Sequence, residues 1–159
     1  MICRASLAHA HKARPAVGTS SSRPGCKKSL TLAAAKEIGN AAEAKARELS
    51  FTNSIAIVDD GGNLIYQVTM DGTQIGSINV ALQKALAALR FKRSTKLFQD
   101  MVTGDKPHMA FLPGAVPVEG GLPLFVDGQI YGAIGVSGMP SDKDGIVAQA
   151  GADLAGTLR

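Results

Sequence analysis

The chain has 159 residues, enough for one domain with a modest core, and it has no tryptophan and few aromatic residues, so that core must rely on aliphatic side chains and alanine. The formal net charge of +4 comes from the first 30 residues, which hold six of the 17 Lys and Arg residues and no acid. The remainder carries 11 basic and 13 acidic side chains, so it lacks the excess of basic side chains that is typical of a nucleic-acid-binding domain. Both cysteines, Cys3 and Cys26, also precede the domain, which excludes disulfides, thiolate metal sites and a cysteine nucleophile from it.

Residues 1–28 form a basic tail rich in Arg, Ser, Ala and Gly. Its composition is typical of an organellar transit peptide. We favour the alternative that it is an extension that never folds, or that the start codon is assigned too early. We therefore expect a disordered basic tail or targeting-like extension over 1–28 and one domain over 29–159. The expected location is the cytoplasm unless the tail is a targeting segment, and no stretch approaches the ~20 apolar residues of a membrane span.

The first half of the domain predicts a helix, a hairpin and a second helix. Strong helix formers fill residues 30–50, and Thr31 or Ser29 can cap their start. Alternating apolar residues on either side of "DDGGN" predict strands over 54–58 and 63–70. A helix is then expected over about 76–91, where alanines would allow close approach to a sheet: Ala81, Ala85 and Ala88.

The second half predicts a short helix capped by Ser94, a long loop over 103–121, a hairpin and a C-terminal helix. Ser141 or Asp142 can cap this last helix, and Asp144 in its first turn suits the helix dipole. The order of elements indicates an α+β fold, an antiparallel sheet with helices packed on it.

Six glycines lie between Pro117 and Gly138, and they do not form a phosphate-binding loop. The dipeptide Asp127–Gly128 between apolar runs indicates a two-residue hairpin turn, and such a turn pairs Val126 with Gln129, Phe125 with Ile130 and Leu124 with Tyr131. One face would carry Phe125, Ile130, Ile134 and Val136. The other would carry Leu122, Leu124, Val126, Tyr131, Ala133, Gly135 and Ser137. Glycine in a strand marks a place where a neighbour approaches the backbone closely, so an alanine-rich helix or a flat ligand could fill the trough on this second face.

Four segments together resemble the GlcG/HbpS family, which includes the C-terminal domain of PduO-type proteins: "IVDDGGNLI", "MDGTQIGSINVALQKALAA", "GGLPLFVDGQIYGAIGVSG" and "DKDGIVAQAGADL". They occur in the order of that family and cover nearly all of residues 29–158. The resemblance implies a profilin-like α/β sandwich with about five antiparallel strands, assembly into homo-oligomers, and haem or another tetrapyrrole as ligand. It also implies haem degradation or redox sensing as further roles.

Haem requires an apolar slot, an axial donor and cations for its propionates. His108 could bind the iron as a metal ligand or be an exposed loop residue, and Met109 could donate its thioether or merely fill space. Tyr131, with Phe91, Phe98 and Phe111, could line the slot or belong to the core. Arg93 belongs to a cationic group that could hold propionates or be a solvated helix end: Arg90, Lys92, Arg93 and Lys96.

Lys84 lies in the "A-x-x-K-A" pattern of that family, and two roles are open to it. It could form a salt bridge with Asp59 or Asp71, or it could point into a pocket and anchor a carboxylate. A zinc site would require more histidine and cysteine ligands than the domain has. A serine triad would have to use His108 as its base, and no serine lies in the strand–turn–helix elbow that exposes such a nucleophile. Three hypotheses follow: a haem-binding protein, an enzyme or accessory protein acting on a small carboxylic acid, or a structural assembly module.

Overall fold

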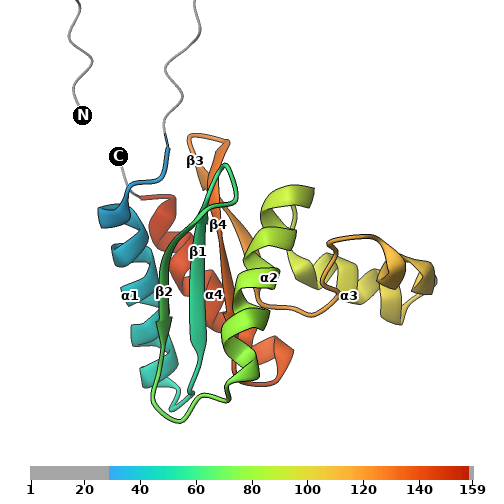
Figure 1. Cartoon of the computed structure of the whole chain (residues 1–159), viewed down its shortest axis with the longest axis horizontal. Helices are drawn as coiled ribbons and strands as arrows, with labels where there is room; N and C mark the ends of the chain where they lie inside the picture. Colours follow the sequence, from blue (N-terminus) through green and yellow to red (C-terminus); the bar gives the residue numbers. More distant parts are fainter. Residues whose placement is uncertain (1–28, 158–159) are drawn as a thin grey trace, which may run out of the picture.

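The computed structural model describes residues 29–157, so the expected tail over 1–28 and both cysteines lie outside the described residues. Helices alternate with two β-hairpins, as the sequence predicts for an α+β fold (Figure 1). The elements are α1 Leu32–Glu48, β1 Ser54–Asp59, β2 Leu64–Thr69, α2 Gly76–Phe91, α3 Thr95–Thr103, the 3-10 helix η1 Pro107–Phe111, β3 Gly121–Val126, β4 Gln129–Ser137 and α4 Ser141–Ala155.

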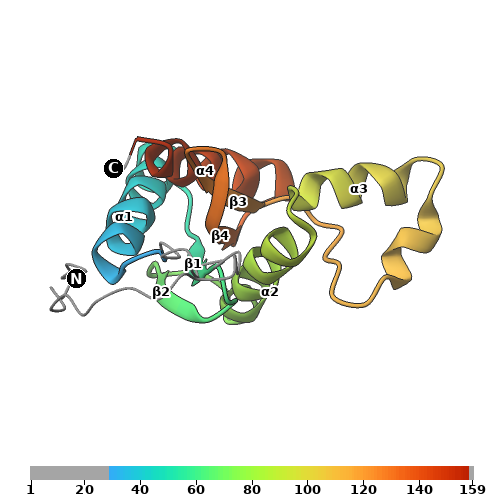
Figure 2. The ribbon, with the colours of Figure 1, turned by 90° about the horizontal axis from the view of Figure 1, so that it is seen from above.

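The four strands described form one antiparallel sheet in the order β2-β1-β4-β3, one strand fewer than the resemblance implies. Helices α1 and α4 cover one face of this sheet and α2 covers the other (Figure 2). Ile55, Ile57 and Ile134 pack in the core toward α1 and α4, whereas Val58 and Ala133 pack against α2. Both faces of the central strands are therefore covered by helices, which explains why neither face of the C-terminal hairpin is plainly polar.

The small residues of β4 let α2 lie directly against the strand. A Cβ atom added at Gly135 would overlap the carbonyl oxygen of Ala81 and lie 2.5 Å from the backbone nitrogen of Ala85. Ser137 extends the contact, since its hydroxyl lies 3.3 Å from that of Ser77 in the first turn of α2. Of the two occupants expected for the trough, the alanine-rich helix is the one that fills it.

Helix α3 and η1 form an arm, residues 95–118, that projects to one side of the sheet (Figure 2). Part of the expected long loop is thus helical. Two hydrogen bonds tie the base of the arm to the strand that follows it: Gly121 N donates to Thr95 Oγ1 at 2.9 Å, and Glu119 N donates to Gln99 Oε1 at 2.8 Å.

One of the three predicted caps forms its hydrogen bond, and a second has the predicted residue at the N-cap position without a side-chain hydrogen bond. Thr31 caps α1 by accepting from Ala34 N at 3.2 Å, and Ser94 occupies the N-cap position of α3. The caps predicted for α4 are wrong, because Pro140 holds its N-cap position. The carboxylate of Asp144 instead accepts from Met139 N at 3.0 Å, which closes the turn that enters the helix.

Candidate functional site

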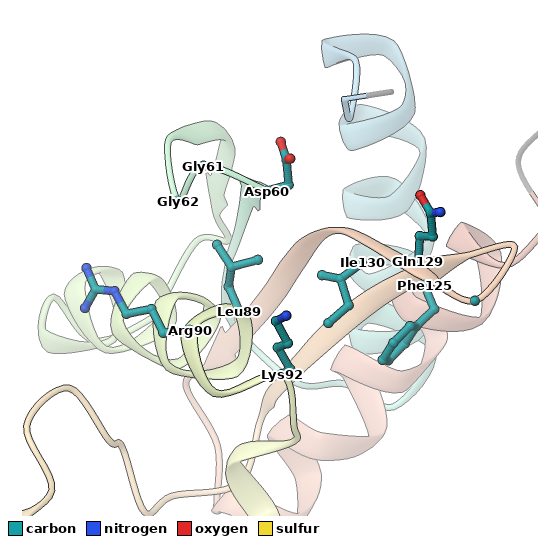
Figure 3. Close-up of a pocket in the computed structure, with 10 residues that line it drawn as sticks. Asp60, Gly61, Gly62, Leu89, Arg90, Lys92, Phe125, Gln129 and Ile130 are labelled. Atoms are coloured by element: carbon teal, nitrogen blue, oxygen red, sulfur yellow. The ribbon is translucent and has the colours of Figure 1, made fainter. Parts of the chain in front are cut away.

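A pocket of about 710 Å³ lies at one end of the sheet, a volume within the usual range for a small-molecule site. Three segments meet there: the β1–β2 turn, the β3–β4 turn and the C-terminal end of α2 (Figure 3). Its lining residues are Asp60, Gly61, Gly62, Leu89, Arg90, Lys92, Phe125, Gly128, Gln129 and Ile130.

The β1–β2 turn owes its shape to Asp59. The carboxylate of Asp59 accepts hydrogen bonds from Gly61 N at 2.9 Å and from Asn63 N at 2.8 Å, and Gly62 adopts a left-handed φ of 83°. Burial opposes ionisation of this carboxyl group, but the hydrogen bonds from Asn63, Gly61 and Gly62 outweigh it and lower the pKa of Asp59. Turn chemistry accounts for this aspartate, and it holds the two glycines at the pocket wall.

The β3–β4 turn is the two-residue hairpin that the sequence predicts, with left-handed φ at both Asp127 and Gly128. Beyond it, the expected pairing of Leu124 with Tyr131 is wrong. Phe125 pairs with Ile130 but Leu124 pairs with Gly132, so Tyr131 is the extra residue of a β-bulge.

This bulge decides which side chains reach the pocket. Because one extra residue reverses the alternation of faces, Phe125 and Ile130 lie on the α2 side of the sheet and line the pocket, instead of sharing a face with Ile134 and Val136. Leu124 lies on the opposite face from the one expected and is buried in the core with Ile134. The pocket therefore has an apolar wall that the simple hairpin register does not predict.

Two cations stand at the C-terminal end of α2, where positive charge suits the helix dipole. Lys92 ends the helix in a left-handed conformation, with φ of 53°. Its side chain lies between Leu89 and Ile130, whereas Arg90 extends away from them (Figure 3). The loop of the arm passes close to Arg90, whose guanidinium nitrogen lies 3.6 Å from where a Cβ of Gly114 would be.

Lys84 lies outside this pocket. It is 1% exposed, and its ammonium donates to Asp144 Oδ2 at 2.8 Å and to the carbonyl oxygen of Val136 at 2.9 Å. The ion pair expected for Lys84 therefore exists, but the expected partners Asp59 and Asp71 are wrong. The bond network joins α2, β4 and α4 in the interior and leaves no ammonium free to anchor a ligand.

The carboxylate of Asp144 has three protein partners. Besides Lys84 and Met139 N, it accepts from Asn53 Nδ2 at 2.9 Å, and Asp144 is itself only 2% exposed. Burial raises the pKa of Asp144, against the opposing effect of the hydrogen bond and charge of Lys84. This pair is a structural tie whose burial makes it sensitive to the loss of either member.

The other residues expected to contact haem are distributed over the molecule. Arg93 lies over the ring of Phe98, 5.8 Å from its centroid, and its Nε donates to Phe91 O at 3.1 Å. Phe98 is buried at the base of the arm, and the half-buried Phe91 packs against it with 5.1 Å between ring centroids. Tyr131 is half-buried at the bulge and does not line the pocket. Contact of these residues with haem stays a prediction.

His108 and Met109 lie on η1, at the outer end of the arm, where His108 is exposed and Met109 half-buried. No residue of the arm lines the pocket. Among residues 29–157 no cluster of three His, Cys, Asp or Glu side chains could hold a metal ion.

The pocket lining fits part of what haem requires. Its aliphatic and aromatic side chains suit a flat apolar ring, and Lys92 and Arg90 suit carboxylates. It contains no histidine, methionine, cysteine or tyrosine, so it offers none of the usual axial donors to an iron. The sequence groups both cations but does not indicate that Leu89 lines a pocket, nor that Phe125 and Ile130 do, because the position of these last two depends on the bulge.

None of the helices in the described part of the chain has the length and apolar character needed to span a bilayer.

Comparison with known proteins gives a consistent result. The model of the family described as "Haem degrading protein HbpS-like" matches residues 30–153. GlcG of Escherichia coli K12 is 36% identical over 97 residues, which cover 61% of this chain and 72% of GlcG.

Solved structures of similar fold include HbpS and a haem complex of PduOC. HbpS of Streptomyces reticuli, solved as a double mutant, is 31% identical with a TM-score of 0.74, over 88% of this chain and 98% of that one. The haem complex of PduOC is 26% identical with a TM-score of 0.69, over 79% of this chain and 94% of that one.

Proposed function

We propose that this chain, which belongs to the HbpS-like family of haem-degrading proteins, binds haem or a closely related tetrapyrrole in the pocket at the hairpin tips. The observation that supports this most directly is the apolar wall with the Lys92 ammonium beside it; Arg90 and the carboxylate of Asp60 also line the pocket. A solved relative of the same fold, PduOC, is described as a haem complex.

The apolar wall suits the macrocycle. Leu89 comes from the last turn of α2, and Phe125 and Ile130 come from the hairpin; Phe125 is 46% exposed. A large aromatic side chain left half-open to water gains free energy when a flat apolar ligand covers it, by about 25 cal/mol for each Å² removed from water. A tetrapyrrole placed here would therefore be held mainly by burial.

The cations suit the propionates. The Lys92 ammonium lies between Leu89 and Ile130, so it can reach a carboxylate at the edge of a ring that packs on those two side chains. Charge-assisted hydrogen bonds of this kind contribute about 1.5–3 kcal/mol. Haem would supply the iron and its redox chemistry; the chain would position the ring and hold the carboxylates.

Binding of a small carboxylic acid by Lys84 or Arg93 has less support. Lys84 is committed to Asp144 in the interior, and Arg93 is engaged with Phe91 and Phe98. Neither residue lines the pocket.

Titration of the purified protein with haem, followed by the Soret band, tests the proposal. We expect saturable binding, and we expect Lys92→Glu to weaken the affinity by at least about tenfold, the equivalent of roughly 1.4 kcal/mol. The matched control is Lys36→Glu, which reverses an exposed charge on α1 and should leave the affinity unchanged. No saturable change with the unmodified protein, or equal affinities for all three proteins, would overturn the proposal.

A further inference from the structure

The lining of the pocket suits the ring and the carboxylates of a tetrapyrrole, but it does not suit a metal at the centre of the ring. Leu89, Phe125 and Ile130 supply apolar surface, and Lys92 and Arg90 supply positive charge. Ammonium and guanidinium groups are hydrogen-bond donors only, so they can pair with carboxylates but offer no electron pair to an iron. Both kinds of contact are therefore directed at parts of the ligand other than its metal.

Two lining side chains carry oxygen atoms, but neither is suited to be an axial ligand. The usual axial ligands of haem iron are His, Met, Cys and Tyr side chains, and Asp60 and Gln129 belong to none of these classes. Figure 3 shows the carboxylate of Asp60 directed away from Leu89 and Lys92. Within residues 29–157 the lining therefore provides no ordinary bond to an iron at the centre of a ring that packs on the apolar wall.

The ammonium of Lys92 is free to pair with a ligand carboxylate. Among residues 29–157 this side chain has no hydrogen-bond or ion-pair partner, and it is exposed beside the apolar wall (Figure 3). The backbone of Lys92 has φ of 53° and ψ of 37°, the left-handed region in which glycine is the favoured residue at a helix end. Folding alone would therefore favour glycine at this position, and a ligand with a carboxylate gives the lysine side chain a role that folding does not.

We propose that the pocket recognises a tetrapyrrole by its ring and its carboxylates and not by its metal, so that an iron-free porphyrin binds as tightly as haem. This rests on the proposed function, because it defines the class of ligand for the same site. Each contact that the lining offers is common to haem and to its iron-free counterpart: burial of the ring against Phe125 and Ile130, and a charge-assisted hydrogen bond from Lys92. Since the iron gains no bond from the lining, its presence does not change the affinity.

Three probes that differ from one another in one feature test this inference on the full chain. Haem and protoporphyrin IX share the ring and the propionates and differ in the iron, whereas protoporphyrin IX dimethyl ester keeps the ring but lacks the negative charges. Porphyrin fluorescence measures binding of the two iron-free probes, and the loss of that fluorescence as haem displaces protoporphyrin IX gives the ratio of the two affinities. We expect haem and protoporphyrin IX to agree within about threefold and the ester to bind at least about tenfold more weakly.

Two variants of Lys92 separate ligand binding from folding. Lys92→Glu should weaken the binding of haem and of protoporphyrin IX to the same extent and leave the binding of the ester unchanged. Lys92→Gly should also weaken both acids, while its melting temperature is equal to that of the unmodified protein or higher, because glycine suits the left-handed backbone. The matched control Lys36→Glu, on the exposed surface of α1, should change neither the affinities nor their ratio.

The affinity ratio decides the inference separately from the proposed function. A difference of more than about threefold between haem and protoporphyrin IX would show that the iron takes part in recognition and would overturn the inference, while saturable binding of haem would leave the proposed function standing. An ester that binds as tightly as protoporphyrin IX, or a Lys92→Gly variant that loses affinity and melting temperature together, would also overturn it. Failure of all three probes to bind would overturn the proposed function as well.

Discussion

Replacing Lys84 by methionine is expected to destabilise the domain strongly. Methionine has a similar length and an apolar side chain, so the substitution removes the charge with little change in packing volume. The ammonium that it removes donates to Asp144 at 2.8 Å and to Val136 O at 2.9 Å, and the two charged side chains are 1% and 2% exposed. Asp144 would keep its hydrogen bonds from Met139 N and Asn53 but would lose the charge that balances it.

The size of the effect follows from this burial. Removal of one partner from a buried ion pair costs about 3–5 kcal/mol, against a total stability of about 5–15 kcal/mol for an ordinary domain. For a domain of this size the melting temperature should fall by roughly 10–20 °C. Urea denaturation followed by circular dichroism measures the difference directly, and Lys45→Met is the matched control, because Lys45 forms an exposed (i, i+3) pair with Glu48 whose loss costs only about 0.2–0.5 kcal/mol.

The pH dependence provides a second readout of the same variant. Burial already raises the pKa of Asp144, and loss of Lys84 should raise the pKa further. A carboxyl group whose folded pKa lies above its unfolded value binds its proton more tightly in the folded state, so its contribution to stability falls as the pH rises through the folded pKa. The deficit of Lys84→Met should therefore be larger at pH 8 than at pH 5. A deficit below about 1 kcal/mol at pH 8, or one that does not change with pH, would refute the reasoning.

Two further substitutions test the packing and the pocket. Gly135→Ala places a methyl group against the backbone of Ala81 and Ala85, so we expect urea denaturation to show a loss of stability of about 1–3 kcal/mol or more. The control Gly76→Ala, whose new methyl group would meet no atom within 4 Å, should cost nothing. Equal stability of the two variants would contradict the close packing of α2 on β4. Asp59→Ala removes the acceptor of the hydrogen bonds from Gly61 and Asn63, so haem titration should show an affinity weakened several-fold. The control Asn40→Ala, on the exposed side of α1, should leave the affinity unchanged. An unaltered affinity in Asp59→Ala would show that the turn does not shape the pocket.

The helices and hairpins could be predicted from sequence because their signals are local. Apolar periodicity located α1, α2 and both hairpins, and the dipeptide Asp127–Gly128 correctly predicted the turn. The close contact between α2 and β4 could also be predicted, since Ala81, Ala85 and Gly135 are all small. Each of these inferences depends on residues within one element or on the size of side chains.

The features that failed depend on contacts between distant parts of the chain. The bulge at Tyr131 has no signal in a sequence where both faces of the hairpin are apolar, and the one-residue offset exchanged the faces expected for Phe125 and Leu124. The partner of Lys84 lies 60 positions later, on a helix that the topology brings alongside. Asp59 and Asp71 lie nearer to Lys84 in the sequence, which does not show that α4 packs beside α2 and β4.

The pocket exists because the sheet extends beyond the helix that covers it. Small residues in the second half of β4 draw α2 onto the strand, and α2 then ends at Phe91, with Lys92 turning the chain away in a left-handed conformation. The hairpin tips continue past that end (Figure 1). The bulge at Tyr131 directs Phe125 and Ile130 toward the uncovered side, so apolar side chains stand where no helix shields them. An exposed apolar surface beside cations often marks a site that a ligand or a partner covers. The same strand that packs the core thereby creates, within residues 29–157, the pocket in which we propose that a flat anionic molecule binds.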